Sequence, residues 1–459
     1  MIRIKRLITT FMLCCSISIL VVIPGKAYAT LDTSMENQQD DESQNITDDQ
    51  SEVEENDVIT QYTGELYFAS DKLSLQQGDS TIYGALLTEE NLSGEEVVYK
   101  SSNKKVVTIS GKGEISAVHY GEAIVTATLG MAKATCKVTV AKDVRITISA
   151  AGDVTLSSDI KQPASVNFFS VYNKQKKDAY FFKNVKSIFE QDDMTIVNFE
   201  GTLSDRGSRV EKQWAFRGKP SYINILSEGS VEAVAFANNH VRDYGEVSYT
   251  DTISSFDQAG IIYSSDSRIG IYETNGIKIG MISIQETSRS DHKTVLRKAI
   301  KAMKKKKHDI LIVSFHWGIE RTSGITGNQK ELSRIAIEEG DADLVLGHHP
   351  HVLQPIEKYK DAYIVYSLGN FCFGGNTNPP DKDTMVYQQT FTFHNDELVP
   401  TDEVSIIPCS VSSVTGRNNY QPTPSTGSEK QRILKKMNGY CKQFDIAFDK
   451  KGKLTTYEK

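Results

Sequence analysis

The pattern of apolar and polar residues changes once along the chain, near residue 142. Before that point, over residues 63–141, short runs alternate between apolar and polar positions, for example at 72–75 and 123–128. Glycine-containing turns such as 111–113 separate these runs. Short strands with turn signals between them, at a spacing of roughly 8–12 residues, are typical of a β-sandwich. We therefore predict a small all-β domain over this part of the chain.

From residue 144 onwards, continuous apolar runs alternate with amphipathic stretches of helical period. This alternation predicts an α/β domain with buried strands over residues 144–408, followed by a C-terminal extension at 409–459. Helices are expected at 178–189, 249–259, 292–307, 329–339 and 429–438. The other expected segments are a hairpin with an Asn-Gly turn at 269–281, a loop beside the site at 374–380, strands at 385–393 and 397–408, and a linker at 421–427.

Six apolar runs in the second half of the chain end in polar or histidine-bearing segments. The residues that follow them are Asp153, Glu200, Asn239 with His240, His316, His349 with His351, and Asn370. Open α/β sheets build their sites at the carboxyl ends of their strands, so we expect these side chains to meet. Taken singly, each has a simpler explanation, such as a turn residue for Asp153 or a packed core histidine for His316. Six such endings at the same topological place favour one site.

The segment Gly347-His348-His349-Pro350-His351 holds three of the nine histidines. A solvated polar loop is the alternative to a functional role, but neutral imidazole is the commonest metal ligand. Together with carboxylate and amide oxygens, imidazoles suit Mn²⁺, Fe or Zn²⁺ better than Ca²⁺ or Mg²⁺. One carboxylate with imidazoles on both sides can bridge two ions. We therefore predict a centre for divalent metal, with two ions.

His240 follows Asn239 directly, so the two side chains do not easily point at the same ion. If Asn239 is a ligand, the imidazole of His240 is free to act as a general acid, and Asp243 is near enough in sequence to orient it. The chain has no GxSxG, P-loop, GxGxxG or HExxH motif that would indicate another chemistry.

Residues 144–408 resemble the CapA family, the capsule or poly-γ-glutamate synthesis proteins related to calcineurin-like metallophosphatases. The resemblance rests on Gly152-Asp153, Asn198-Phe199-Glu200-Gly201-Thr202, Asn239-His240 with Asp243 and Gly245, His316-Trp317-Gly318, the 347–351 segment with Gln354-Pro355, and Tyr366-Ser367-Leu368-Gly369-Asn370-Phe371. It implies a four-layer αββα metallophosphatase-like fold. The implied roles are Asp153 and His351 as ligands of one ion, Asn239, His316 and His349 as ligands of a second, Glu200 as the bridge, His240 and Asp243 as catalytic residues, and His348 and Asn370 as substrate contacts.

The function implied by this resemblance is that of an exported, metal-dependent hydrolase or transferase. Its implied substrate is an anionic surface polymer, poly-γ-glutamate, and its implied partner is the cell wall or membrane synthesis machinery. Two residues depart from the phosphatase pattern: Thr155 stands where Asp-x-His usually ends, and Glu200 stands where an Asp is usual. Thr155 favours an alternative, a non-catalytic polymer-binding or export-assisting subunit with a structural or vestigial metal site. The intact set of histidines favours the enzyme.

Residues 63–141 resemble the bacterial Ig-like (BIG) domains of surface proteins. The resemblance rests on four stretches, 99–103, 106–109, 113–117 and 121–127. It implies a spacer or a module that binds the wall or a partner. A plain adhesin would be a third function, which the motifs of the second half disfavour.

Residues 1–29 have the features of a secretory signal. Three basic residues within positions 3–6 precede an apolar run at 7–23, and Ala27-Tyr28-Ala29 is a small-x-small cleavage site. We therefore expect a secreted or cell-surface protein; an uncleaved N-terminal anchor is the alternative.

Charge is concentrated near the N-terminus. Residues 30–62 contain eleven acidic residues and no lysine or arginine, so we expect a disordered acidic linker there. The whole chain carries −7, and residues 1–29 carry four basic residues and no acidic one. The linker therefore accounts for all of the −11 that remains after the signal, and the folded part is close to neutral. A near-neutral body has no basic surplus for binding nucleic acid.

Four cysteines follow the signal: Cys136, Cys372, Cys409 and Cys441. None forms a CxxC pair, so a thiolate zinc site is not expected. An exported protein could hold disulfides, but the spacing assigns no pairing. We expect buried free thiols.

Overall fold

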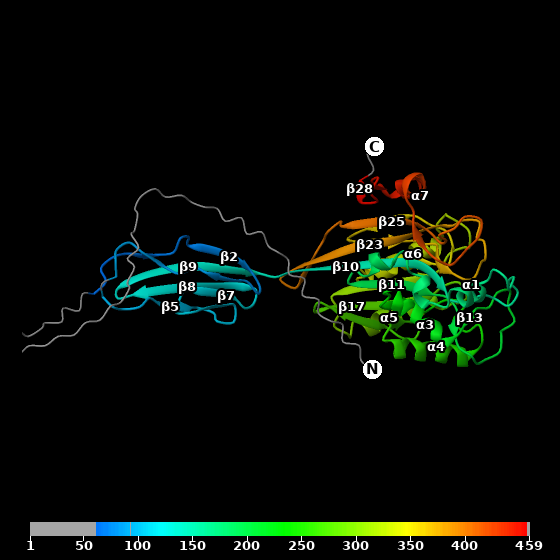
Figure 1. Ribbon diagram of the computed structural model, residues 1–459, viewed down its shortest axis with the longest axis horizontal. Helices are drawn as coiled ribbons and strands as arrows, with labels where there is room; N and C mark the ends of the chain where they lie inside the picture. The colour runs from blue at the N-terminus through cyan, green and yellow to red at the C-terminus, as the bar shows by residue number, and fades with distance from the viewer. Residues whose placement is uncertain (1–60, 92, 457–459) are drawn as a thin grey trace, which may run out of the picture. The chain divides into compact units, whose positions relative to one another are not determined.

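The computed structural model describes residues 61–91 and 93–456. The signal predicted at 1–29 lies outside these residues, as does the acidic linker predicted at 30–62 apart from its last two positions. The described residues form a β domain, blue to cyan in Figure 1, and an α/β domain in the remaining colours. No helix within them is long and apolar enough to cross a membrane.

The β domain consists of a four-stranded sheet, β2-β9-β8-β5, a three-stranded sheet, β3-β7-β6, and the pair β1 and β4. The bounds are Leu66–Tyr67 for β1, Lys72–Gln76 for β2, Ser80–Ile82 for β3, Leu86–Leu87 for β4, Val98–Ser101 for β5, Val107–Ile109 for β6, Glu114–Ala117 for β7, Gly121–Leu129 for β8 and Ala132–Ala141 for β9. Buried and less buried positions alternate along β8 and β9, and Ile115, Val125 and Val138 are fully buried in one shared core. The predicted all-β sandwich is thereby confirmed.

The first sheet of the α/β domain has the order β15-β14-β11-β10-β23-β25-β26, with β22 beside β10 and β24 beside β23. Its strands are β10 Asp143–Thr155, β11 Met194–Phe199, β14 Ala233–Ala235, β15 Ile262–Ser264, β22 Asn370–Phe373, β23 Asp383–His394, β24 Glu397–Val399, β25 Val404–Ser410 and β26 Thr423–Pro424. The strands β10, β11, β14 and β15 are parallel, whereas β23 joins β10 in the antiparallel direction. The carboxyl ends of the four parallel strands therefore lie along one edge.

The second sheet has the order β16-β17-β18-β19-β21-β20. Its strands are β16 Gly270–Thr274, β17 Ile277–Gln285, β18 Ile310–His316, β19 Leu344–His348, β20 Ile356–Tyr359 and β21 Ala362–Val365. The hairpin of β16 and β17 turns at Asn275 and Gly276, which have φ values of 51° and 79°. Two positive φ values in succession are typical of the type I′ turn, and the predicted hairpin is confirmed.

The two sheets pack face to face, and helices cover their outer faces. Side chains of both sheets, such as Ile196 and Ile312, share one core. The other face of the first sheet packs on α1, α3 and α4, and that of the second sheet on α5 and α6. These helices are α1 Phe168–Gln175, α3 Ile223–Glu228, α4 Glu246–Ala259, α5 His292–Met303 and α6 Gly327–Glu338. This arrangement confirms the four-layer αββα fold.

Two parts of the helical layer differ from the prediction. The helix expected at 178–189 is interrupted: a 3-10 turn at Asp178–Tyr180 is followed by the short helix α2, Lys186–Phe189. Phe181 and Phe182, between the two pieces, are both buried in the core of that layer. The short helices α1 and α3 were not predicted.

The described part of the predicted extension 409–459, residues 409–456, packs within the α/β domain. The strand β25 continues to Ser410, β26 lies in the predicted linker, and α7 (Gly427–Cys441) follows. Ile433 and Met437 of α7 belong to the core between the sheets. The last elements are β27 Ile446–Phe448 and β28 Leu454–Thr456. All four predicted free cysteines are buried and unpaired, which confirms that expectation.

Candidate metal centre

The polar residues predicted to form one site come together at the carboxyl ends of strands from both sheets. Asp153 is opposite Asn198 of β11 on one side and Asn370 of β22 on the other. In the second sheet, His316 is opposite His348. Hydrogen bonds and close contacts between side chains then join the two sheet edges into one cluster.

Glycine permits the close packing of the strands that carry these residues. A Cβ atom at Gly152 would lie 1.9 Å from the carbonyl oxygen of Gly369, and one at Gly347 would lie 1.9 Å from that of Tyr366. Any other side chain would force the strands apart. The glycines that precede Asp153 and His348 are therefore needed to bring the donors together.

The histidine-rich loop is held in a strained conformation. His349 has a φ of 97° and His351 a φ of 58°, values that residues other than glycine rarely adopt. Such positions cost on the order of 1–3 kcal/mol each and cluster at functional sites. The strain brings the two imidazoles on either side of Pro350 into the site: the centroids of their rings lie 5.8 Å apart.

Asp153, Glu200 and His351 form the first donor group, in which one ligand atom from each lies within 4.8 Å of the others. The ring nitrogens of His351 lie 3.1 Å from Asp153 Oδ2 and 3.9 Å from Glu200 Oε1. Both carboxylates are fully buried, yet Asp153 Oδ2 and both oxygens of Glu200 accept no hydrogen bond from the described residues. Buried carboxylate oxygens without donors are costly unless a cation is close, so this group fits a metal ion.

Asn239, His316 and His349 form the second donor group. His316 Nε2 lies 2.9 Å from Asn239 Oδ1 and 3.1 Å from His349 Nδ1. Asn198 Nδ2 lies 3.4 Å from His316 Nδ1 and donates to Asp153 Oδ1 at 2.8 Å. An amide oxygen and two imidazole nitrogens thus converge, and Asn198 links the two groups.

Burial sets the protonation of these imidazoles. It lowers the pKa of His349 to about 4 and that of His316 well below its ordinary value. Both rings are therefore neutral near pH 7, as a metal ligand must be. In the first group, burial raises the pKa of Glu200, while the neighbouring Glu200 and Asp153 carboxyls outweigh burial and raise the pKa of His351. Without an ion this group therefore keeps a proton at pH 7, and a bound cation would displace that proton.

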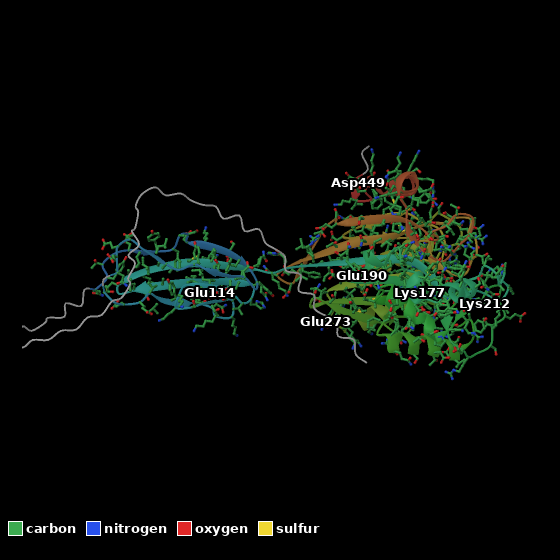
Figure 2. All side chains as sticks on the ribbon, viewed as in Figure 1. Glu114, Lys177, Glu190, Lys212, Glu273 and Asp449 are labelled. Carbon is green, nitrogen blue, oxygen red and sulfur yellow. The ribbon has the colours of Figure 1, made fainter. Side chains whose placement is uncertain are left out.

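His240 is placed beside the first group by a hydrogen-bonded network. Its Nδ1 lies 2.6 Å from Asp243 Oδ2, and its Nε2 lies 3.5 Å from Glu200 Oε1. Lys212, which is labelled in Figure 2, lies on the loop between β12 (Thr202–Leu203) and β13 (Arg217–Gly218). It donates to Asp243 Oδ1 at 2.7 Å. Phe216 N donates to Asp243 Oδ2 at 2.6 Å. The carboxylate therefore fixes the ring so that Nε2 faces the centre.

A cavity of about 250 Å³ opens beside this centre. Its lining includes His240, His351 and Asn370 on the side of the site, and residues of the loop at 374–380, which was expected there. Asn370 Oδ1 lies 2.9 Å from His351 Nδ1, so this amide also orients the imidazole. The cavity gives a substrate access to the proposed ligands.

His348, predicted as a substrate contact, lies behind the cavity. It is only 2% exposed and is not part of the cavity lining, so its role as a substrate contact stays a prediction. Its Nδ1 lies 3.6 Å from Asp153 Oδ1, and neither ring nitrogen has a hydrogen-bond partner among the described residues. Alternate residues of a strand face opposite sides, and the motif alone did not show which histidines turn to the cavity.

Three residues of the site were missed as functional. Asn198 had a signal in the sequence, because it precedes Glu200 by two positions on a strand. Lys212 and Glu320 lie on loops and had none. Thr155, where an imidazole was missing, is fully buried and offers only an unpartnered hydroxyl.

Fold and donor set together define a four-layer αββα domain with a candidate metal centre at the carboxyl ends of its strands. Residues 147–375 match the family described as bacterial capsule synthesis protein PGA_cap, and residues 67–140 match the bacterial Ig-like domain, group 2. The α/β domain therefore belongs to this family of capsule synthesis proteins, and it follows a bacterial Ig-like domain.

The relatives agree with this assignment. The chain is 30% identical over 271 residues to the capsule biosynthesis protein CapA of Bacillus anthracis, which covers 53% of this chain and 64% of that protein. It is 30% identical over 245 residues to the PGA biosynthesis protein CapA of Bacillus subtilis strain 168, which covers 48% of this chain and 64% of that protein. The chain thus spans less than two thirds of these relatives.

Among solved structures, the calcineurin-like phosphoesterase YfkN from Bacillus subtilis covers 65% of this chain and 99% of its own, at 15% identity and a TM-score of 0.38.

Proposed function

We propose that this chain is a metal-dependent hydrolase or transferase that acts on an anionic cell-surface polymer. The observation that carries the proposal is the pair of fully buried carboxylates, Asp153 and Glu200, whose oxygens lack hydrogen-bond donors and lie beside imidazoles and a cavity. Carboxylates with a purely structural role are paired with donors of the chain.

Each donor group would hold one divalent ion. Asp153 and His351 would bind the first, Asn239, His316 and His349 the second, and Glu200 would be shared. When bound, such ions lower the pKa of a water molecule and balance the charge that develops on the reacting group.

The other polar groups position the substrate and move a proton. Nε2 of His240 faces both Glu200 and the cavity, so it can exchange a proton with the leaving group. Asp243 holds the opposite nitrogen, and Lys212 in turn holds Asp243.

The cavity wall supports an anionic substrate with apolar segments. Lys161 and Arg321 bring positive charge, and Arg321 forms no ion pair within the part of the chain that the structure describes. Trp214, which is 40% exposed, brings apolar surface. A glutamate polymer offers both carboxylates and methylene groups, and the two relatives are named for capsule and PGA biosynthesis. Poly-γ-glutamate is therefore our proposed substrate.

We further propose that the protein acts at the cell surface, beside the wall or membrane machinery that makes the polymer. The secretory pattern of residues 1–29 supports this place.

The function can be tested with purified protein that is stripped by a chelator and reloaded with Mn²⁺. Incubation with poly-γ-glutamate should change the length distribution of the polymer, as followed by gel filtration, and the stripped protein should leave it unchanged. His316→Ala is the control, because it removes a ligand. Tight polymer binding without cleavage under Mn²⁺, Fe²⁺ or Zn²⁺ would contradict the enzyme and support a non-catalytic polymer-binding or export-assisting subunit, the alternative that Thr155 favours.

A further inference from the structure

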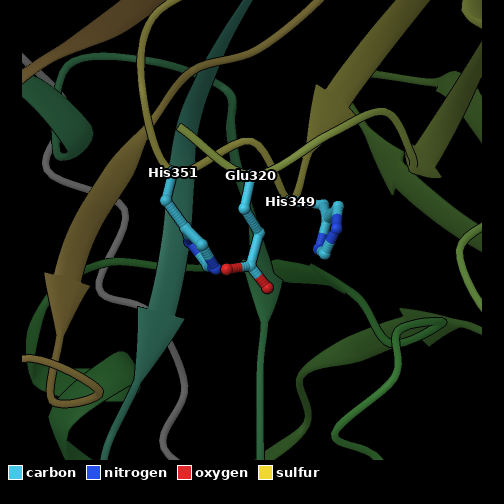
Figure 3. A group of neighbouring side chains, drawn as sticks. All are labelled: Glu320, His349 and His351. Carbon is cyan, nitrogen blue, oxygen red and sulfur yellow. The ribbon is translucent and has the colours of Figure 1, made fainter. Parts of the chain in front are cut away.

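Glu320 lies at the open side of the candidate metal centre. Its carboxylate and the ring nitrogens of His349 and His351 offer ligand atoms that all lie within 4.8 Å of one another. In Figure 3 the carboxylate of Glu320 meets the imidazole of His351, with His349 alongside. Glu320 itself is exposed and lines the cavity. Proximity to two histidines alone does not make an exposed glutamate a metal ligand. The hydrogen bonds that hold its loop in place are therefore the next evidence.

The loop that carries Glu320 is fixed by two buried glutamines. Gln354 Nε2 donates to the carbonyl oxygens of Thr322 at 2.8 Å and Gly324 at 3.0 Å. Gln329 Nε2 donates to Gln354 Oε1 at 2.8 Å, and both glutamine side chains are fully buried. These bonds explain why the histidine-rich segment is followed by Gln354.

A second tie joins this loop directly to the histidine-rich loop. Arg321 N donates to the carbonyl oxygen of Pro350 at 2.7 Å, and Arg321 is held at a φ of 57°. Pro350 lies between His349 and His351, so the bond sets Glu320 against both imidazoles. A non-glycine residue with positive φ is costly and persists where the surroundings fix it.

The carboxylate of Glu320 faces the two histidines and not a basic side chain. Within the described residues, no lysine or arginine forms an ion pair with it, while the ring nitrogens of His349 and His351 lie within 4.8 Å. An ordinary surface glutamate would point to water or to a basic neighbour.

The two histidines belong to different donor groups: His351 lies with Asp153 and Glu200, and His349 with His316 and Asn239. Thr155 supplies no imidazole to the first group. We propose that Glu320 is a metal ligand shared by the two groups on the solvent side, as Glu200 is on the buried side. This inference rests on the proposed function, since it needs a metal centre.

The test is Glu320→Gln in the full chain, which keeps the size of the side chain and removes its charge. The protein is stripped, reloaded with Mn²⁺, and its ions per chain are counted by mass spectrometry after gel filtration, while affinity is measured by titration. We expect at least one ion to be lost or to bind about 10–100-fold more weakly. The metal affinity of Glu320→Asp should lie between that of Glu320→Gln and that of the wild type.

Glu331→Gln is the matched control, because Glu331 of α6 is exposed, pairs with Lys293 and lies outside the cavity lining. It should bind metal as the wild type does. The melting temperature of the metal-free Glu320→Gln protein should equal that of the metal-free wild type. Wild-type stoichiometry and affinity in Glu320→Gln, with loss of metal in His316→Ala, would overturn this inference alone. A wild-type protein that binds no metal would overturn the proposed function as well.

Discussion

His240 and His316 lie in the same cluster, but their surroundings give them different tasks. His316 is buried between Asn239 and His349, with its Nε2 within 3.1 Å of both. His240 has one nitrogen on Asp243 and the other toward Glu200 and the cavity. Burial lowers the pKa of His240, and the hydrogen bond to Asp243 offsets only part of this effect. A ring held in this way is suited to passing a proton rather than holding an ion.

We therefore expect His240→Ala to keep its metal and lose turnover by about 10²–10⁴-fold, the usual contribution of a general acid. His316→Ala should lose both metal and turnover without unfolding, since a ligand at a strand end adds little to the core. Metal content and polymer cleavage, measured on the same preparations, check both expectations. Full activity in His240→Ala would rule out the proton-transfer role.

The cleavage rate of Asp243→Asn should lie between those of the wild type and His240→Ala. The amide can still accept from Phe216 N, but it no longer carries the charge that holds Lys212 and the imidazole. Cleavage rates of the three proteins at equal metal content test this order. A variant as slow as His240→Ala would show that the charge of Asp243, and not only its geometry, is needed.

At this scale the sequence predicted the donors that follow strands, because strand ends meet by topology. It could not predict Glu320 or Lys212, since the path of a loop depends on distant partners such as Gln354. The burial of His348 could not be predicted either, because the direction of its side chain follows from the register of β19, which the motif does not contain.

At the scale of elements, hydrogen bonds between oppositely charged side chains connect α7 to the first sheet. Arg432 donates to both oxygens of Asp383 at 2.8 and 2.5 Å, and Lys436 donates to Asp383 at 2.9 Å and to Asp381 at 2.7 Å. Burial raises the pKa of Asp383, but these hydrogen bonds outweigh it and hold the pKa below its ordinary value. The bonds connect the start of β23 to the C-terminal helix.

Because the folded pKa of Asp383 is depressed, its contribution to stability is present above the unfolded value, about 3.9, and is lost as pH falls through the lower folded value. We expect Asp383→Asn to reduce the free energy of unfolding by about 1–3 kcal/mol at pH 7. The difference from the wild type should shrink below about pH 4, where the unfolded carboxyl already binds a proton. Denaturant titrations at both pH values measure it.

Asp361→Asn serves as the control, since Asp361 is exposed on the turn between β20 and β21. This substitution should leave the free energy of unfolding unchanged at both pH values. An Asp383→Asn protein that stays equally destabilised in acid would show that packing, and not charge, fastens α7.

The alternation of strands and helices could be predicted because apolar periods differ between the two elements. The division of the strands between two sheets could not, since buried strands of either sheet have the same continuous apolar pattern. The interruption of the helix expected at 178–189 was not predicted either, since the apolar period of this segment is helical throughout.

At the scale of the whole molecule, the β domain has a core of its own. None of the core residues it buries belongs to the clusters of the α/β domain. We expect deletion of residues 63–141 to leave turnover of soluble polymer unchanged while it alters retention at the surface. Cleavage assays and cell fractionation of the two forms check this. Collapse of turnover in a truncated protein that is still folded would contradict it.

Metal should also stabilise the α/β domain, because a ligand that binds only the folded chain shifts the folding equilibrium. At a free metal concentration of 100 Kd the gain is about 2.7 kcal/mol per site. Thermal unfolding with Mn²⁺ and with a chelator measures this stabilisation, which should be smaller in His316→Ala. Identical melting temperatures in both conditions would exclude a site that forms only on folding.

The division into two domains could be predicted from the sequence because the apolar pattern changes near residue 142. The C-terminal extension was placed outside the domain because its short apolar runs resemble a linker, whereas α7 contributes Ile433 and Met437 to the central core.

The conformation of His349 has a consequence for selection. At its φ of 97°, a histidine is less stable than a glycine would be, by on the order of 1–3 kcal/mol. A laboratory screen for heat tolerance in the presence of a chelator, where no bound ion stabilises the fold, is therefore expected to retain His349→Gly. The same screen with Mn²⁺ present is expected to keep the histidine, so the residue selected at this one position reports whether the metal was bound.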